Sequence, residues 1–101
     1  MPFHAGVAAA KGAVEGLTRS LAAEYAPTIR VNAIAPSLTD TPLAEKLLAT
    51  EDKREASAER HPLKRVGAPQ EIAAMASFLL SEKAAFVTGQ VIGMDGGLSA
   101  V

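Results

Sequence analysis

The sequence predicts an α/β fold in which two short parallel strands are joined by a helical crossover. Three observations support it: an amphipathic helical pattern near the start, two short runs typical of strands, and helical patterns between those runs. Strands joined by a helical crossover run parallel, and parallel strands need both faces covered. A two-stranded parallel sheet with an unpaired edge is a poor independent fold. We therefore expect this chain to be part of a larger sheet.

The first helix is expected from about Val7 to Tyr25, with Pro27 ending it. Its large apolar face steps by three and four residues, as one side of a helix does. That face consists of Val7, Ala10, Val14, Leu17 and Leu21. A second face carries only small side chains, which let another helix approach closely. It consists of Ala9, Ala13, Gly16 and Ser20. We interpret this small-residue face as a candidate subunit interface.

The first strand is expected from Ile29 to Ala35, where residues of alternating character are closed by Pro36. After a loop, residues 43–60 are helix-prone but heavily charged. Their apolar residues gather at the start, at Leu43, Leu47 and Leu48. A segment anchored at one end and loose at the other is typical of a lid, so residues 43–61 are expected to form a mobile substrate flap.

The next helix is expected to begin at Pro69, because proline in the first turn lacks only a donor that the helix does not need. Glu71 suits the same turn. Its predicted buried face consists of Ile72, Met75, Ala76, Leu79 and Leu80. The turn Thr88-Gly89 then leads into a last strand, Gln90 to Met94, which ends at a pair of glycines.

Composition narrows the possible partners. The 101 residues are 49% apolar and 21% charged, as in one globular domain or part of one. A net charge of −1 provides no basic field for nucleic acid or an anionic membrane, so small molecules are the expected partners. The absence of cysteine excludes disulfides and thiolate metal sites, and we predict no metal site. Without a basic leader or a long apolar run, a cytoplasmic location is expected.

Several motifs occur in an order that resembles the C-terminal part of a short-chain dehydrogenase/reductase. They are Val7-Ala8-Ala9-Ala10-Lys11-Gly12-Ala13, Arg30-Val31-Asn32-Ala33-Ile34-Ala35-Pro36, Arg65-Val66-Gly67-Ala68-Pro69-Gln70-Glu71, Thr88-Gly89-Gln90 and Asp95-Gly96-Gly97. The resemblance implies a doubly wound, Rossmann-like parallel sheet and an oxidoreductase that uses NAD or NADP on an alcohol or carbonyl substrate. The small-residue face of the first helix favours a homodimer or homotetramer.

The family's catalytic motif, Tyr-x-x-x-Lys, is present here only in part: Lys11 stands at the lysine position and Val7 at the tyrosine position. The resemblance implies that Lys11 is a catalytic residue that binds the nicotinamide ribose. Alternatively, Lys11 is a surface lysine whose stem covers apolar side chains. Valine has no proton to exchange. His4 lies close enough in sequence to replace the phenol as the acid, or it is an ordinary exposed histidine.

The loop after the first strand resembles the family's Pro-Gly-x-x-x-Thr segment beside the nicotinamide. Pro36 and Thr41 match, and Ser37 replaces the glycine. The resemblance implies cofactor contacts from Pro36, Ser37, the backbone near Leu38 and the Thr41 hydroxyl. The residues alone equally allow a proline-bounded turn that caps the next helix. The capping candidates are Thr39, Asp40 and Thr41.

Other matched positions are expected to be structural. Asn32 ties strands together, Arg65 and Glu71 orient the helix after the flap, and Gly96 with Gly97 allow close approach of the chain around the last strand.

The N-terminal half of the family pattern has no counterpart here, since no Gly-x-x-x-Gly-x-Gly turn precedes these motifs. Residues 1–101 are therefore expected to be a partial Rossmann-like domain without the glycine-rich cofactor half. Such a partial domain is expected by itself to bind a dinucleotide weakly or not at all and to be inactive. Two explanations stay open. The chain is a truncated piece of a full-length oxidoreductase, or it is a stable remnant that serves as an oligomerisation or small-molecule binding module without catalysis.

Overall fold

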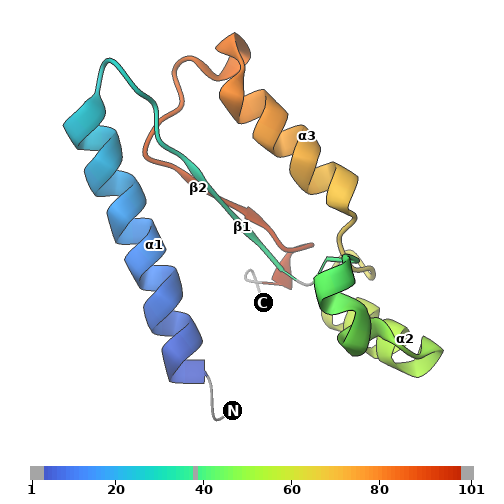
Figure 1. The fold of residues 1–101 in the computed structure, drawn as a ribbon. Coiled ribbons are helices and arrows are strands. Elements are labelled where there is room, and N and C mark those ends of the chain that lie inside the picture. The colour runs from blue at the N-terminus through green and yellow to red at the C-terminus, as the bar shows by residue number, and fades with distance from the viewer. Residues whose placement is uncertain (1–3, 38, 99–101) are drawn as a thin grey trace. The chain divides into compact units, whose positions relative to one another are not determined.

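The computed structural model describes residues 4–37 and 39–98. A helix is followed by one strand, then by several helical elements and finally by the second strand, and the two strands form one sheet of order β1-β2 (Figure 1). The elements are α1 (His4–Tyr25), β1 (Ala33–Pro36), the 3-10 helix η1 (Pro42–Leu48), α2 (Glu51–Arg60), α3 (Pro69–Leu80), the 3-10 helix η2 (Glu82–Ala84) and β2 (Val91–Met94). By its internal contacts the chain divides into two compact units. The first is Met1–Ala33 with Leu79–Ile92, and the second is Ile34–Phe78 with Gly93–Val101.

Helix α1 ends at Tyr25, as predicted, because Pro27 cannot continue it. The amides of Thr28 and Ile29 then both donate to the Tyr25 carbonyl at 2.9 Å. The buried side of α1 differs from the expected stripe: Thr18 and Ala22 are each 5% exposed, while Leu17 is 59% exposed.

The sheet is parallel, as predicted. The Ala33 amide donates to the Gln90 carbonyl and the Ser37 amide to the Met94 carbonyl, so the partner numbers rise together along both strands. Strand β1 is shorter than the predicted Ile29 to Ala35. Before Ala33 the backbone is satisfied differently, because the Val31 amide donates to the side chain of Thr88 at 3.0 Å. A side-chain partner replaces a rung of the ladder, so the regular strand begins later.

In the first unit, Asn32 ties two segments together, as its family position implies. Its side-chain nitrogen donates to the Val87 carbonyl at 3.0 Å, and its side-chain oxygen accepts from the Gln90 amide at 3.1 Å. The Asn32 side chain therefore hydrogen-bonds both a carbonyl and an amide of the turn that precedes β2.

The Arg30 guanidinium lies in a cluster of backbone carbonyls in the first unit. It donates to the carbonyls of Leu79 and Ala84 at 2.9 Å, and to those of Ser81 and Val87 at 3.3 Å. The last carbonyls of a helix have no partner within the helix. Arg30 satisfies them at the end of α3 and at the turn beyond it, which fixes the path of the chain from α3 into β2.

In the second unit, the segment expected to be a flap consists of η1 and α2. Thr50 caps α2, since its hydroxyl accepts from the Lys53 amide at 3.1 Å. Acidic residues follow in the first turn, where their negative charge interacts favourably with the helix dipole. Leu48 is buried, as the expected anchor requires, but Leu47 is 60% exposed. Ser57 is also buried, so α2 has a packed side beyond the apolar anchor.

Helix α3 begins at Pro69, as predicted. Its expected buried face is correct at Leu79, which is buried, and at Ile72 and Met75, which are half-buried. The prediction was wrong for Leu80, which is 85% exposed as the last residue of the helix. Among the described helices, none is both long enough and apolar enough to cross a membrane.

Candidate functional site

The residues of the broken catalytic motif lie on one continuous helix. Helix α1 begins at His4, so His4, Val7 and Lys11 all have helical backbone, and Val7 and Lys11 are one turn apart. The side chain of Lys11 is exposed. The side chains of His4 and Val7 lie outside the described residues. The structure therefore bears out the helical spacing on which the family motif depends.

The predicted nicotinamide-side loop lies in the second unit. Pro36 is exposed at the end of β1, and Leu38 lies outside the described residues. Thr41 stands at the N-cap position of η1, but its hydroxyl makes no capping bond there. The Thr39 hydroxyl instead donates to the Ser37 carbonyl at 3.1 Å. The Thr41 side chain therefore does not cap η1, although the sequence allowed it.

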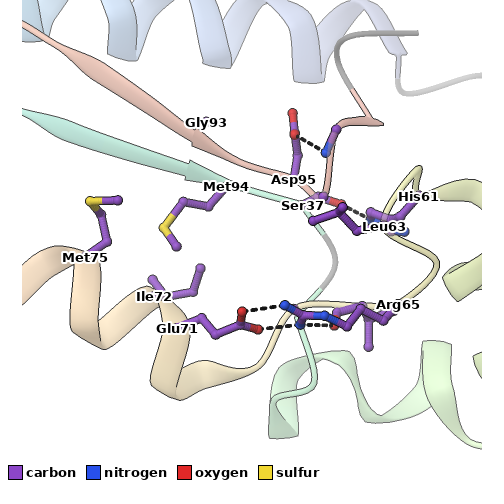
Figure 2. A pocket seen from close by; sticks show the side chains of 14 residues that line it. Ser37, His61, Leu63, Arg65, Glu71, Ile72, Met75, Gly93, Met94 and Asp95 are labelled. Carbon is purple, nitrogen blue, oxygen red and sulfur yellow. Dashed lines mark hydrogen bonds and ion pairs between the residues drawn. The ribbon is translucent and has the colours of Figure 1, made fainter.

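A cavity of about 370 Å³ lies within the second unit, between the end of the sheet and the start of α3 (Figure 2). Its apolar wall is formed by Ile72 and Met75 of α3 and by Met94 of β2. Its polar wall is formed by side chains from four different segments. They are Ser37, His61, Asp95 and the pair of Arg65 with Glu71. Thr41 does not line this cavity but a more open hollow beside Asp40 and Arg54.

Ser37 and His61 are hydrogen-bonded across the polar wall. The Ser37 hydroxyl lies 2.5 Å from the His61 Nε2, and the His61 Nδ1 lies 2.7 Å from the Ser57 carbonyl oxygen. His61 is only 3% exposed. Both ring nitrogens thus have partners, as a buried imidazole requires.

The turn after β2 packs against the same histidine. Gly96 and Gly97 have φ angles of +59° and +89°, which favour glycine. A Cβ placed on Gly96 would lie 3.4 Å from the His61 ring, and one on Gly97 would lie 3.1 Å from the ring of Pro62. The glycines therefore allow the close approach that the sequence predicts, and the Asp95 carboxylate holds the turn by accepting from the Gly97 amide at 3.0 Å.

Arg65 and Glu71, which line the cavity, form a bidentate ion pair with both nitrogen to oxygen distances at 2.6 Å (Figure 2). Glu71 also accepts from the Ala68 amide at 2.9 Å, which caps the start of α3. The hydrogen bond from Arg65, followed by that from Ala68, lowers the pKa of Glu71 to about 2. The same pair raises the pKa of Arg65. As predicted, these residues fix the start of α3.

The cavity combines an apolar wall with a few fixed polar groups, which is the usual character of a small-molecule site. Among the described residues, no group of three or more acidic or histidine side chains gathers as metal ligands would. Sequence reasoning missed His61, which lies at the end of the segment expected to be a flap. Two signals were available: it is one of only two histidines, and it directly precedes a proline.

Comparison with known proteins establishes the family. Residues 1–99 match the family model described as enoyl-(acyl carrier protein) reductase. The chain belongs to the short-chain dehydrogenase/reductase family. A curated member from Thermotoga maritima, a 3-oxoacyl-(acyl-carrier-protein) reductase, is 48% identical over 96% of this chain and 39% of its own length. The inactive 2-(S)-hydroxypropyl-CoM dehydrogenase 2 of Xanthobacter autotrophicus is 46% identical over all of this chain and 46% of its own length.

Solved structures of the short-chain dehydrogenase/reductase family agree. A 4-hydroxyisoleucine dehydrogenase complexed with NADH is 34% identical, with a TM-score of 0.85 over 92% of this chain and 39% of that one. The α/β fold predicted as the C-terminal part of a Rossmann-like sheet is thereby confirmed. The chain spans less than half the length of these members of the family.

Proposed function

We propose that this chain is the C-terminal portion of an NAD(P)-dependent short-chain oxidoreductase that acts on an alcohol or carbonyl substrate. The observation that supports this most is Lys11, which occupies the lysine position of the family motif on an unbroken helix. The family match covers the motifs on both sides of the flap segment as well.

The cofactor would be NAD or NADP, whose nicotinamide ring donates or accepts a hydride. The residues present suit the nicotinamide half of such a molecule. Lys11 is exposed and can donate from its ammonium to ribose hydroxyls. The Thr41 hydroxyl makes no capping bond, which leaves it suited to a carboxamide or phosphate, and Pro36 and Ser37 begin the same loop at the carboxyl end of a parallel strand.

Proton transfer to the substrate has no assigned residue. Val7 occupies the position of the phenol, and a valine side chain cannot exchange a proton. His4 is a candidate replacement because it lies on the same helix, three residues before Val7.

Cofactor binding is tested by titrating the chain with NADH and NADPH while nicotinamide fluorescence is followed. Binding by this chain alone is expected to be weak because the glycine-rich half of the cofactor site is missing, so the titration extends to millimolar cofactor. Where the fluorescence increases, Lys11→Met should weaken the affinity roughly 10-fold or more, since a hydrogen bond from a charged group contributes about 1.5–3 kcal/mol. The matched control is Lys83→Met, which removes another exposed lysine. No fluorescence change at millimolar cofactor, or equal weakening by both variants, would contradict cofactor binding at Lys11.

Three further expectations belong to the same proposal. Residues 43–61 would act as the flap that contacts the substrate, since they connect the candidate cofactor loop to α3. The protein would assemble as a homodimer or homotetramer through the small-residue face of α1. We also expect it to be located in the cytoplasm.

The alternative function is a catalytically inactive module for oligomerisation or small-molecule binding. Val7 favours it, and a relative 46% identical to this chain is named as inactive. Turnover of an alcohol or carbonyl substrate distinguishes the two functions. NADH binding without such turnover supports the inactive module. The substitution Val7→Tyr, made in a longer protein that carries this sequence, then tests whether the proton-donating phenol is the only catalytic group that is missing. A gain of turnover would favour the oxidoreductase.

A further inference from the structure

The hydrogen bonds of His61 determine which way its protons point. The Ser57 carbonyl oxygen can only accept, so the Nδ1 atom, 2.7 Å away, carries the hydrogen of a neutral imidazole. In a neutral ring the Nε2 atom is then an acceptor, so we assign the Ser37 hydroxyl, 2.5 Å away, as its donor. The tautomer follows from this hydrogen-bond network. Ser37 and His61 therefore form a directed pair.

The His61 ring is enclosed on its other sides. The residue lies at the C-terminal end of α2, where its amide donates to the Ala58 carbonyl at 3.1 Å. The chain of Gly96 passes close to the ring, and the Gly96 carbonyl accepts from the Leu63 amide at 3.0 Å. With 3% of its surface exposed, His61 has little freedom to turn away from Ser37.

Ser37 is the second residue of the candidate cofactor loop, and hydrogen bonds hold its amide, its carbonyl and its hydroxyl. Its amide donates to the Met94 carbonyl at 3.2 Å, which ties it to β2. Its carbonyl accepts from the Thr39 hydroxyl, which folds the loop back on itself. Its hydroxyl is bound to His61, 24 residues away. A glycine, which the family pattern places at this position, could make only the backbone contacts.

We infer that the Ser37–His61 hydrogen bond is a latch that joins the end of α2 to the candidate cofactor loop and fixes the position of Ser37 in that loop. His61 is thus a positioning residue that acts through Ser37. The consequence for the nicotinamide end of a dinucleotide rests on the proposed function. A loop held in one conformation before binding loses less conformational entropy when the ligand arrives, which raises affinity.

The first measurement is nitrogen NMR of the histidine rings in the 101-residue chain. We expect His61 as the tautomer protonated at Nδ1, with an Nε2 resonance that shifts in Ser37→Ala. The matched control is Ser57→Ala, another substitution of serine by alanine beside His61, which keeps the Ser57 carbonyl. An Nε2 resonance that does not respond to Ser37→Ala, or the opposite tautomer, would overturn the latch.

The second measurement is hydrogen exchange of the loop. The Ser37 amide donates to the Met94 carbonyl, and the Asp40 amide donates to the Gly67 carbonyl. The exchange rates of these two amides report how often their hydrogen bonds open. The loss of one hydrogen bond, worth about 0.5–1.5 kcal/mol, should accelerate their exchange roughly 2- to 10-fold in Ser37→Ala and in Ser37→Gly. Ser57→Ala should leave their exchange unchanged. Equal exchange in wild type and Ser37→Ala would mean that the loop does not depend on the latch.

The third measurement is the NADH dissociation constant, which separates the two proposals. We expect it to rise in Ser37→Ala by the same factor as loop exchange, and to stay unchanged in Ser57→Ala. If the wild-type chain binds no NADH, the proposed function fails, whereas the NMR and exchange results still decide the latch. If NADH binds equally to wild type and Ser37→Ala although loop exchange accelerates, the inferred effect of the latch on the cofactor is wrong.

Discussion

Single residues in the second unit act through the hydrogen bonds of their side chains. Glu71 illustrates this at the start of α3, where it accepts hydrogen bonds from Arg65 and from the Ala68 amide. A carboxylate that accepts several hydrogen bonds is favoured in its charged form. Its pKa is lowered from 4.5 to about 2 for that reason, so the stabilisation that it provides must depend on pH.

The first prediction concerns that dependence. A depressed folded-state pKa contributes stability above the unfolded value of 4.5, and this contribution is lost as the pH falls from 4.5 towards 2. Urea unfolding should give a lower free energy of unfolding for wild type at pH 3 than at pH 7. In Glu71→Gln this difference between the two pH values should be smaller, because the contribution of Glu71 is absent. Glu59→Gln is the control, because Glu59 pairs with Lys64 at 2.9 Å on an exposed surface. An unchanged pH dependence in Glu71→Gln would contradict the prediction.

The residue scale also shows the limits of sequence reasoning. Arg65 and Glu71 are six positions apart, and their role could be anticipated from the order of residues around Pro69. His61 could not be placed in the same way, because its partner Ser37 lies 24 positions away on another segment. A contact of this kind depends on how the segments fold together, and no local pattern encodes it.

At the scale of elements, Arg30 connects the end of α3 to the turn before β2. Its guanidinium donates to four backbone carbonyls at 2.9–3.3 Å. Removing it would leave half-buried carbonyls without their charged donor, which costs more than the loss of a neutral hydrogen bond.

The second prediction is that Arg30→Met lowers the free energy of unfolding by roughly 1.5–3 kcal/mol, the contribution of hydrogen bonds to a charged group. Arg30→Lys should recover only part of it, because an ammonium cannot match the fixed fork of five donors. Chemical denaturation of the three proteins measures the difference. Full recovery by lysine would show that charge alone is sufficient.

Element boundaries were predictable where a local signal sets them. The end of α1 near Pro27 and the start of α3 at Pro69 both follow from the geometry of proline. The start of β1 was predicted four residues too early, because Asn32 and Thr88 replace ladder bonds with side-chain bonds. The exposure of Leu17 was also missed, since helical periodicity identifies an apolar face but not what covers it.

At the scale of the whole molecule, the described residues leave large apolar side chains in contact with solvent. Leu80 is 85% exposed and Leu17 is 59% exposed. Apolar surfaces of this kind mark interfaces in many proteins. The small-residue face of α1 presents a second surface that permits close helix packing. The proposed homodimer or homotetramer would use surfaces of this kind.

The third prediction concerns that association. Ala13→Arg places a long charged side chain on the small-residue face and should convert a dimer or tetramer to smaller species. Glu15→Arg introduces the same side chain about 160° around the helix and should leave the assembly intact. Light scattering coupled to size-exclusion chromatography measures the mass of each species. A monomeric wild-type chain, or equal dissociation by both variants, would contradict the role of this face.

The sequence by itself determined the family, the order of helices and strands and the parallel sheet, because these depend on local periodicity, on proline and glycine, and on motifs that keep their order. It also placed Val7 and Lys11 one turn apart on a helix. Only the tertiary structure decided which faces are buried, where β1 begins, and that His61 meets Ser37. Those outcomes depend on contacts between distant segments, since packing and the satisfaction of buried polar groups are settled after the segments come together.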